Sequence, residues 1–476
     1  MSHAPAAARQ HHHRTLLILG VGALAYSLAQ TTVVPALASI QAEFAVSTTD
    51  ITWMVTGYFL AASIATPVMG RLGDMFGKER FLAISLVAFA AGSIVCALSD
   101  SLAPMVVGRA LQGVGGGVFP LSFGIVRDEF PRDKVATGIA MLGAIAGIGG
   151  AIGLPLGGFL AEHAGFQWIF WISAAMGVVA TVTTIRFVPE SPVRTPGRID
   201  LVGAIVMGAG LTCVLIAISR ANDWGWGSAT TLGLIAAGAV VLAGFAAFER
   251  RHPQPLINMA TLSRRPVLMT NLATLLVGFG LFGTFILVPQ LAELPKGGEV
   301  GLGMDPTEAG LLLAPGGILM LFVAPIAGRI GERRGSKLPL AVGCLVAIAG
   351  LAGLAFLHDS ALQLIVWSMV LNVGVGFAFA ALPNLIVDAV DGHETGEATG
   401  VNTIFRNVGG SLGSQVSAAI LTGHVLASGM PGDAGFRMAF LVGAGGAAVA
   451  ALIALALPRH ERRGEAPAGA LAAAER

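Results

Sequence analysis

Long apolar runs separated by short polar connections fill the chain from about residue 15 to residue 457. A helix needs about 20 mostly apolar residues to cross a bilayer, and fourteen runs fit that requirement. Their approximate ranges are 15–37, 51–72, 80–98, 103–126, 136–161, 167–188, 200–219, 229–249, 267–289, 308–330, 338–357, 361–384, 398–426 and 436–457. The pattern predicts an all-α polytopic membrane protein with fourteen spanning helices.

The composition agrees with a chain that lies in lipid. It is 55% hydrophobic and 12% charged, and it contains 65 glycines, which suits closely packed membrane helices. The net charge of +1 gives no reason to expect a nucleic-acid partner. Cys96, Cys213 and Cys344 each fall inside an apolar run, so packed free thiols are expected. We interpret the histidines at 11–13 as part of an inert tail, and no metal site is expected.

One charged segment occurs twice in the chain. Residues 70–80 read GRLGDMFGKER, and residues 328–337 read GRIGERRGSK. Two further segments recur in the same order. ATG at 136–138 corresponds to ATG at 398–400, and GGAIG at 149–153 corresponds to GGSLG at 409–413. The repeat predicts two bundles of six helices. Its boundaries are a tail at 1–14, a first bundle at 15–190, an inserted helix pair with linkers at 191–265, a second bundle at 266–458 and a tail at 459–476.

The distribution of basic residues predicts the orientation in the membrane. Most of the 28 Lys and Arg fall in the termini and in the even-numbered connections between the predicted helices. Because Lys and Arg are enriched on the cytoplasmic side, both termini are expected there. The connection from Asp388 to Glu397 is the exception, since it is acidic and has no Lys or Arg.

The duplicated segment resembles the loop signature of the major facilitator superfamily of secondary transporters. The resemblance implies two bundles that rock about a site near the middle of the membrane. We expect Asp74 at the start of the thirteenth helix and Glu332 at the start of the fifth, because a helix N-terminus favours a carboxylate. These acids would close a cytoplasmic gate. The other expected gate residues are Gly70, Gly77, Lys78, Gly328 and Gly335.

The fourth apolar run carries a second family-like pattern. Residues 107–117 read VGRALQGVGGG, and they resemble a signature whose arginine is implicated in proton coupling. A guanidinium inside the membrane is costly and normally marks function. The resemblance therefore implies that Arg109 takes part in proton coupling, with Gln112 and the gate acid Asp74. The alternative is that Arg109 ties helices together by bonding backbone carbonyls.

The fifth run holds small residues at a spacing of four. Gly149, Gly153 and Gly157 form a stripe that lets a neighbouring helix approach closely. With Pro155 and Gly158, the stripe resembles the antiporter signature of drug exporters, although the proline stands one place later than usual. Simple helix packing is the alternative interpretation.

The first run resembles the opening helix of the fourteen-helix drug:proton antiporters. Residues 28–37 read LAQTTVVPAL, but Ala29 stands where that family commonly has an aspartate. No predicted helix has Asp or Glu near its middle. The expected substrate cavity comprises Gln30, Thr31, Arg109, Gln112, Phe119, Asn271, Asn402 and Arg406. Because two cations without a carboxylate repel a cation, a neutral, zwitterionic or anionic amphipathic substrate is expected.

Together these features predict a secondary transporter that exports small amphipathic compounds or drugs in exchange for protons, by alternating access. We expect a monomer in the inner or plasma membrane, driven by the proton gradient and without a bound cofactor. The chain has no GxxxxGK[ST] phosphate cradle for an ATP-driven pump and no recognisable catalytic cluster, so an enzyme is not expected. A solute:proton symporter or importer on the same fold, and a transport-inactive sensor or scaffold, are the alternatives.

Overall fold

The computed structural model describes residues 12–46, 48–51, 53–191, 200–252, 255–426 and 430–458. These residues form helices and short connections, with one isolated bridge between Val425 and Pro431. The expectations for the two tails, except for residues 12–14, and for residues 192–199 of the linker lie outside the described residues.

The first group of helices precedes the inserted pair. Its members are α1 (His12–Thr31), α2 (Leu37–Phe44), α3 (Thr48–Ile51), α4 (Trp53–Phe76), α5 (Lys78–Ala97), α6 (Leu102–Val114), η2 (Gly115–Gly117), α7 (Val118–Glu129), α8 (Arg132–His163) and α9 (Gln167–Phe187). Helix α1 packs on α8 and α9, α5 packs on α6 and α9, and α4 packs on α6. The three glycines of η2 separate α6 from α7.

The second group repeats this arrangement. Its members are α13 (Arg265–Glu293), α14 (Pro306–Leu311), α15 (Ala314–Arg334), α16 (Lys337–Phe356), α17 (Ala361–Ala389), η3 (Gly392–Glu394), α18 (Thr395–Gly423) and α19 (Asp433–Ala456). Helix α13 packs on α18 and α19, as α1 packs on α8 and α9. Helix α16 packs on α17 and α19, as α5 packs on α6 and α9. The duplicated sequence thus has a duplicated packing order.

The inserted pair consists of α10 (Leu201–Trp224) and α11 (Ala229–Glu249), and α12 (Met259–Leu262) leads from it to the second group. Helix α10 packs on α11, on α4 of the first group and on α18 of the second. The apolar side chains of Leu232, Val240 and Phe248 on α11 are exposed. The pair therefore lies over a seam between the two groups, with α11 outermost.

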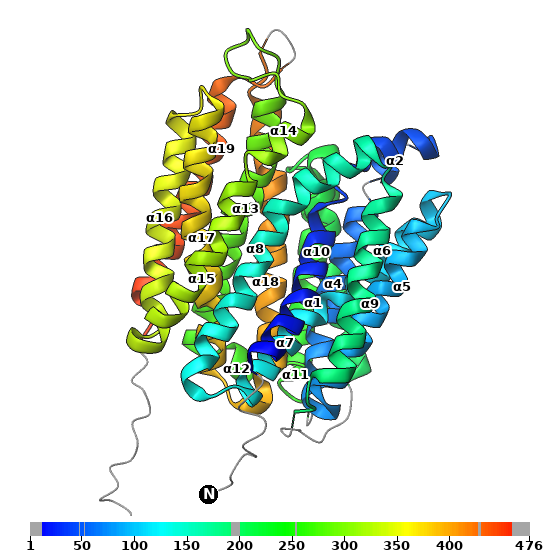
Figure 1. The fold of residues 1–476 in the computed structure, drawn as a ribbon, viewed down its shortest axis with the longest axis vertical. Helices are drawn as coiled ribbons and strands as arrows, with labels where there is room; N and C mark the ends of the chain where they lie inside the picture. Colours follow the sequence, from blue (N-terminus) through cyan, green and yellow to red (C-terminus); the bar gives the residue numbers. More distant parts are fainter. Residues whose placement is uncertain are drawn as a thin grey trace, which may run out of the picture.

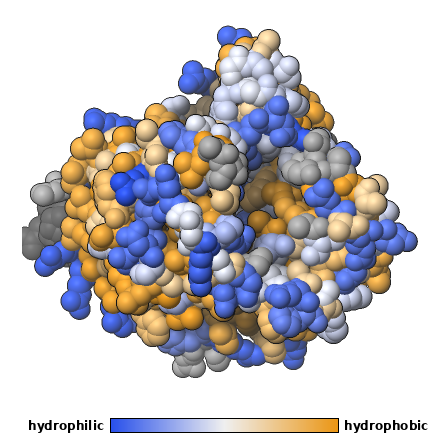
Figure 2. Space-filling view, turned by 90° about the horizontal axis from the view of Figure 1, so that it is seen from above, coloured by the Kyte–Doolittle hydropathy of each residue, from blue (hydrophilic) through white to orange (hydrophobic). Residues whose placement is uncertain are grey.

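The two groups face each other across a long contact (Figure 1). Helix α8 packs on α15 and α17, and α18 packs on α4 and α7. We call the lower end in Figure 1, where α4 and α15 end and α12 lies, the gate end. Figure 2 views the molecule from the opposite end, where the surface is hollowed near its centre and atoms deep in the hollow are mostly hydrophobic.

Among the described residues, eleven helices are long and apolar enough to cross a membrane. The other three predicted runs are also helical, but none of them combines the length and the apolar composition of a spanning helix. The run at 103–126 is interrupted by η2, α1 has polar residues at both ends, and α18 carries polar residues such as Asn402, Arg406 and Asn407 along its length. Length and composition alone therefore find fewer spans than the fourteen predicted.

Two sequence predictions about local structure are wrong. The first helix ends at Thr31 and not near residue 37, because turns that include Pro35 precede α2. The duplicated segment is not a loop, since α4 continues to Phe76 and α15 to Arg334. Only Gly77, with φ of 118°, and the short turn at Gly335, with φ of 82°, reverse the chain. The gate acids therefore project from helices, which hold them more rigidly than a loop would.

Close packing inside the second group depends on glycine, and Gly374 in α17 provides a test. A Cβ at this position would overlap the amide nitrogen of Ala347 in α16. We expect Gly374→Ala to lower the free energy of unfolding by about 1–3 kcal/mol, because the two helices must separate. The exposed Gly233 in α11 is the matched control, since a Cβ there has no neighbour within 4 Å. Thermal unfolding of the purified variants in detergent measures the difference, and equal stability of the two variants would contradict the packing argument.

Candidate functional site

Asp74 in α4 joins the two groups at the gate end. Its Oδ2 accepts hydrogen bonds from the backbone N–H groups of Gly396 at 3.1 Å and Glu397 at 3.3 Å, in the first turn of α18. The Asp74 side chain is buried at 1% exposure. The chains approach so closely here that a Cβ on Gly70 would overlap the carbonyl of Gly396. A carboxylate at a helix N-terminus is stabilised by the unpaired N–H groups and the helix dipole.

Lys78 supplies the positive charge next to this carboxylate. Its fully buried Nζ lies 3.4 Å from Asp74 Oδ1 and 2.6 Å from Asp128 Oδ2. Asp128 also accepts a hydrogen bond from Ser191 Oγ at 2.5 Å. The sequence analysis missed Asp128, which lies at the end of α7. A buried charge without a partner is strongly destabilising, so Lys78 and the two aspartates depend on one another.

Glu332 in α15 makes the second connection between the groups. Its Oε1 accepts hydrogen bonds from Thr137 in α8, from the backbone N–H at 3.2 Å and from Oγ1 at 2.6 Å. A Cβ on Gly328 would lie 2.7 Å from Thr137 Cα, so this glycine also permits a close approach. The repeat led us to expect Asp74 and Glu332 at the starts of these two helices. In the structure, Asp74 contacts the first turn of α18, and Glu332 contacts the second turn of α8.

Two arginines of the first group contact the acidic segment from Asp388 to Glu397. Arg127 donates hydrogen bonds to the carbonyls of Val390 at 2.8 Å and Asp391 at 3.2 Å, and to Thr395 Oγ1. Arg71 lies 3.7 Å from Glu397. The segment has no Lys or Arg of its own, and Arg71 and Arg127 of the opposite group supply positive charge. This pairing accounts for the connection from Asp388 to Glu397, which lacks the Lys and Arg residues of the other even-numbered connections.

The linker that follows the inserted pair also binds this segment. Asn258 Nδ2 donates to Glu394 at 2.8 Å, and the backbone N–H of Asn258 donates to Glu397. Thr261 Oγ1 donates to Glu394 at 3.0 Å. The inserted pair is therefore connected to the gate end through α12 and not only through lipid-facing contacts.

Arg109 is buried at 1% exposure and connects its own helix, α6, to α1 and α4. Its Nε donates to the carbonyl of Met54 at 3.2 Å, and its Nη1 donates to the carbonyl of Ala29 at 3.0 Å and to Gln112 Oε1 at 2.8 Å. Gln112 Nε2 in turn donates to Ser93 Oγ at 2.7 Å. Two of the three acceptors of Arg109 are backbone carbonyls, which is the geometry of the alternative in which Arg109 ties helices together.

A row of aromatic rings connects Arg109 with Arg406 of the second group. The Arg109 guanidinium lies 4.3 Å from the ring centre of Tyr58, and Tyr58 stacks on Tyr26 at 5.8 Å. Tyr26 meets Phe119 at 6.1 Å, and the Arg406 guanidinium lies 5.2 Å from Phe119. The row thus crosses from one group to the other.

Arg406 differs from Arg109 in its surroundings. It is partly exposed, and it has no hydrogen bond or ion pair with another described residue. Its other aromatic neighbour is Phe379 in α17, at 5.7 Å. The sequence analysis named neither Phe379 nor the tyrosines as site residues. The only available signal was that the chain has just two tyrosines and both fall inside apolar runs.

The remaining predicted cavity residues make contacts of their own. Thr31 donates a hydrogen bond to the carbonyl of Gly149 at 3.2 Å, so it lies in the contact between α1 and α8. Asn402 donates to Asn271 at 2.8 Å and to Thr274 at 2.7 Å, in the contact between α13 and α18. Gln30 is buried, and its Nε2 has no partner among the described residues. The contribution of these residues to a substrate cavity stays a prediction.

The glycine stripe of α8 packs on α1. A Cβ on Gly149 would overlap Ser27, and one on Gly153 or Gly157 would overlap Thr31 or Thr32. The opposite side of α8 meets the second group, where Gly158 lies near Thr307 and Pro155 near Gly310. In α18, Gly409 and Gly413 contact α13 in the same way. This is the packing role that the alternative interpretation expected.

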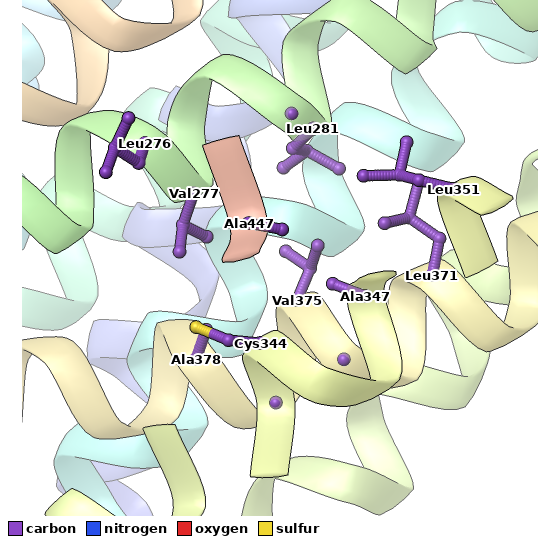
Figure 3. A pocket seen from close by; sticks show the side chains of 13 residues that line it. Leu276, Val277, Leu281, Cys344, Ala347, Leu351, Leu371, Val375, Ala378 and Ala447 are labelled. Carbon is purple, nitrogen blue, oxygen red and sulfur yellow. The ribbon is translucent and has the colours of Figure 1, made fainter. Parts of the chain in front are cut away.

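Figure 3 shows a pocket inside the second group. Its wall comprises the residues Leu276, Val277, Gly280, Leu281, Gly343, Cys344, Ala347, Leu351, Leu371, Gly374, Val375, Ala378 and Ala447. The volume is about 10 Å³, the space of about one water molecule. Sites for small molecules need roughly 300–1,000 Å³. This pocket is therefore a packing defect and not a candidate substrate site.

Two bundles with repeated packing, joined at one end through Asp74 and Glu332, have the architecture of a membrane carrier. The model of the Major Facilitator Superfamily matches residues 19–414, and the chain belongs to this family. It is a transporter of small molecules and not an enzyme.

Several similar proteins are named as resistance, export or transport proteins. The chain is 30% identical to the tetracenomycin C resistance and export protein of Streptomyces glaucescens, over 89% of this chain and 79% of that one. It is 27% identical to the multidrug transporter protein MdtP of Bacillus subtilis, over 86% and 75%. It is also 28% identical to the multidrug resistance protein Stp of Mycobacterium tuberculosis, over 87% and 76%.

A solved structure has the same fold at low sequence identity. The crystal structure of the human organic anion transporter MFSD10 matches with a TM-score of 0.63 and 15% identity. The match covers 93% of this chain and 99% of the other. At this identity the match concerns the fold alone.

The hydrogen bonds of Arg109 predict a specific stability difference. Arg109→Lys keeps the charge but cannot reach Met54, Ala29 and Gln112 together, and hydrogen bonds to a charged group are worth about 1.5–3 kcal/mol each. We expect a loss of about 2 kcal/mol or more in the free energy of unfolding. Arg406→Lys is the control, because a lysine ammonium can also lie against the aromatic rings. Thermal unfolding in detergent compares the two, and a smaller loss for Arg109→Lys than for Arg406→Lys would contradict the assignment.

Proposed function

We propose that the protein exports small amphipathic compounds in exchange for protons, by alternating access, as a fourteen-helix drug:proton antiporter. The observation that carries the proposal is the reciprocal pair of acids at the gate end. Asp74 of the first bundle binds the start of α18, and Glu332 of the second binds the start of α8. In this proposal the described conformation is closed at the gate end and accessible from the opposite end, where the surface is hollowed (Figure 2).

The relatives support the direction of transport. Three of them are named for drug resistance, multidrug transport or export of an antibiotic. The proposed count of fourteen spans adds three segments to the eleven helices that length and composition identify as spans. These segments are α1, the α6–α7 run and α18. Each lies where a predicted span lies and packs among the other spanning helices.

We place the coupling proton on the gate acids. An arginine keeps its proton in proteins, so Arg109 cannot itself carry it. Asp74 is buried, contacts Lys78 and receives two backbone hydrogen bonds that would be lost when the bundles separate. In this scheme separation changes the affinity of Asp74 for a proton, while Arg109 and Gln112 hold α6 in register with α1, α4 and α5. The proton gradient supplies the energy, without a bound cofactor.

The substrate is proposed to be neutral or anionic. Arg406 presents a guanidinium without a polar partner among the described residues, between aromatic rings from both bundles. The buried acids of the described residues, Asp74, Asp200, Glu249, Glu394 and Glu397, lie at or next to helix ends. A cation near Arg406 would be repelled, whereas an anion would be attracted and would satisfy the guanidinium. Aromatic rings on both sides would accept an apolar ring of the substrate.

The protein is proposed to act as a monomer in the inner or plasma membrane, with both termini and the gate end in the cytoplasm. The basic residues at the gate end support this orientation, because Lys and Arg favour the cytoplasmic side. A solute:proton symporter on the same fold would use the same gate with the opposite direction of transport. A transport-inactive sensor would keep the fold and lose the flux.

Substrate-induced pH changes in everted vesicles test direction, coupling and charge preference together. We expect proton movement with neutral and anionic amphipathic compounds, and none with the cation ethidium. Arg406→Gln should weaken the response to anions about tenfold or more, which corresponds to about 1.4 kcal/mol. The response to neutral compounds should not change. Arg437→Gln is the matched control, because this half-exposed arginine pairs with Asp433 on α19.

Each other outcome has a distinct meaning. Strong ethidium export would overturn the charge preference and leave the export function intact. Substrate movement in the direction opposite to export would identify an importer. An absence of flux for every compound tested, with a folded protein, would identify a sensor or scaffold.

A further inference from the structure

An open groove lies at the turn between α15 and α16, at the gate end of the second bundle. Its volume is about 450 Å³. It is lined by Ile326, Arg329, Ile330, Arg333, Arg334 and Leu338. Neither the proposed substrate path nor the two gate acids use these side chains. The groove therefore needs an explanation of its own.

The three arginines of the groove have no charge partner in the part of the chain that the structure describes. Arg329, Arg333 and Arg334 are exposed and make no ion pair or hydrogen bond with another described residue. The first copy of the repeat differs here, because Arg71, the counterpart of Arg329, pairs with Glu397. In the register that matches ATG at 136–138 with ATG at 398–400, the counterpart of Glu397 is Val135. The second copy thus keeps the base and lacks the acid.

An exposed apolar stripe leads into the arginines. Phe322 is 65% exposed and Ile326 is 50% exposed. Together with Arg329 and Arg333, they lie on one face of α15, since their spacing follows the helical turn. The turn between α15 and α16 lies at the outer lower edge of the molecule in Figure 1. The stripe therefore faces the hydrocarbon region, and the arginines lie where the headgroups begin.

We propose that this groove binds an anionic phospholipid. The phosphate lies against Arg329, Arg333 and Arg334, and an acyl chain lies along Phe322 and Ile326. Arginine forms paired hydrogen bonds with phosphate oxygens, and basic pockets at one membrane face commonly bind anionic lipid headgroups. The volume suits part of a lipid, and the uncompensated positive charge selects an anionic headgroup over a zwitterionic one. This site does not depend on the transport direction or the substrate.

Native mass spectrometry of the purified full-length protein tests the site. The probes are phosphatidylglycerol and phosphatidylcholine with identical acyl chains. We expect preferential binding of phosphatidylglycerol, weakened about thirtyfold in Arg329→Gln/Arg333→Gln, because each interfacial arginine contributes about fivefold. The variant Arg250→Gln/Arg251→Gln removes the same charge from exposed residues at the same end of the molecule and should bind within about threefold of the unchanged protein. Arg329→Lys/Arg333→Lys retains the charge and should keep most of the binding.

Three results would overturn the proposal. Equal binding of phosphatidylglycerol by the unchanged protein and by Arg329→Gln/Arg333→Gln would show that the lipid does not use these arginines. Equal losses in the two glutamine variants would show a general effect of net charge. Displacement of phosphatidylglycerol by glycerol phosphate alone would show a site for free phosphate and no role for the apolar stripe.

Discussion

The structure depends on a carboxylate of each bundle that binds a helix of the other bundle near its start. Asp74 binds the first turn of α18, and Glu332 binds Thr137 in the second turn of α8. The contact of Asp74 is directional, because it uses N–H groups that have no partner within their own helix. It is also reversible, since water can replace the same hydrogen bonds when the bundles separate. A carrier needs this combination in a gate that closes specifically and opens repeatedly.

The two acids have unequal surroundings. Asp74 belongs to a buried cluster with Lys78 and Asp128, and the neighbouring Arg71 pairs with Glu397. Glu332 binds Thr137, and the neighbouring Arg333 and Arg334 are exposed. Both halves therefore have an acid that binds a helix of the other bundle. The charged residues next to the two acids have different partners. A similar difference appears deeper in the molecule, where Arg109 donates hydrogen bonds to backbone carbonyls and Arg406 lies against the aromatic rings of Phe119 and Phe379.

Much of this arrangement could be predicted because it repeats. The apolar runs gave the positions of the helices, and the matched segments placed Asp74 and Glu332 against particular helix starts. The helical state of residues 70–76 could not be predicted, because glycines that suggest a loop in water also serve close packing in lipid. The contacts of Arg406 with Phe119 and Phe379 join helices of different bundles. Hydrophobic periodicity identifies a buried face but not the helix that covers it.

The distance between the bundles at the gate end tests the central claim most directly. Spin labels at Asp133 of the first bundle and at Ser263, directly before α13 of the second, report this distance in a protein without its three native cysteines. The account predicts a short distance at rest and a second, longer distance during transport. It also predicts that Asp74→Asn combined with Glu332→Gln populates the longer distance without substrate. A single unchanged distance in all of these conditions would contradict the gate.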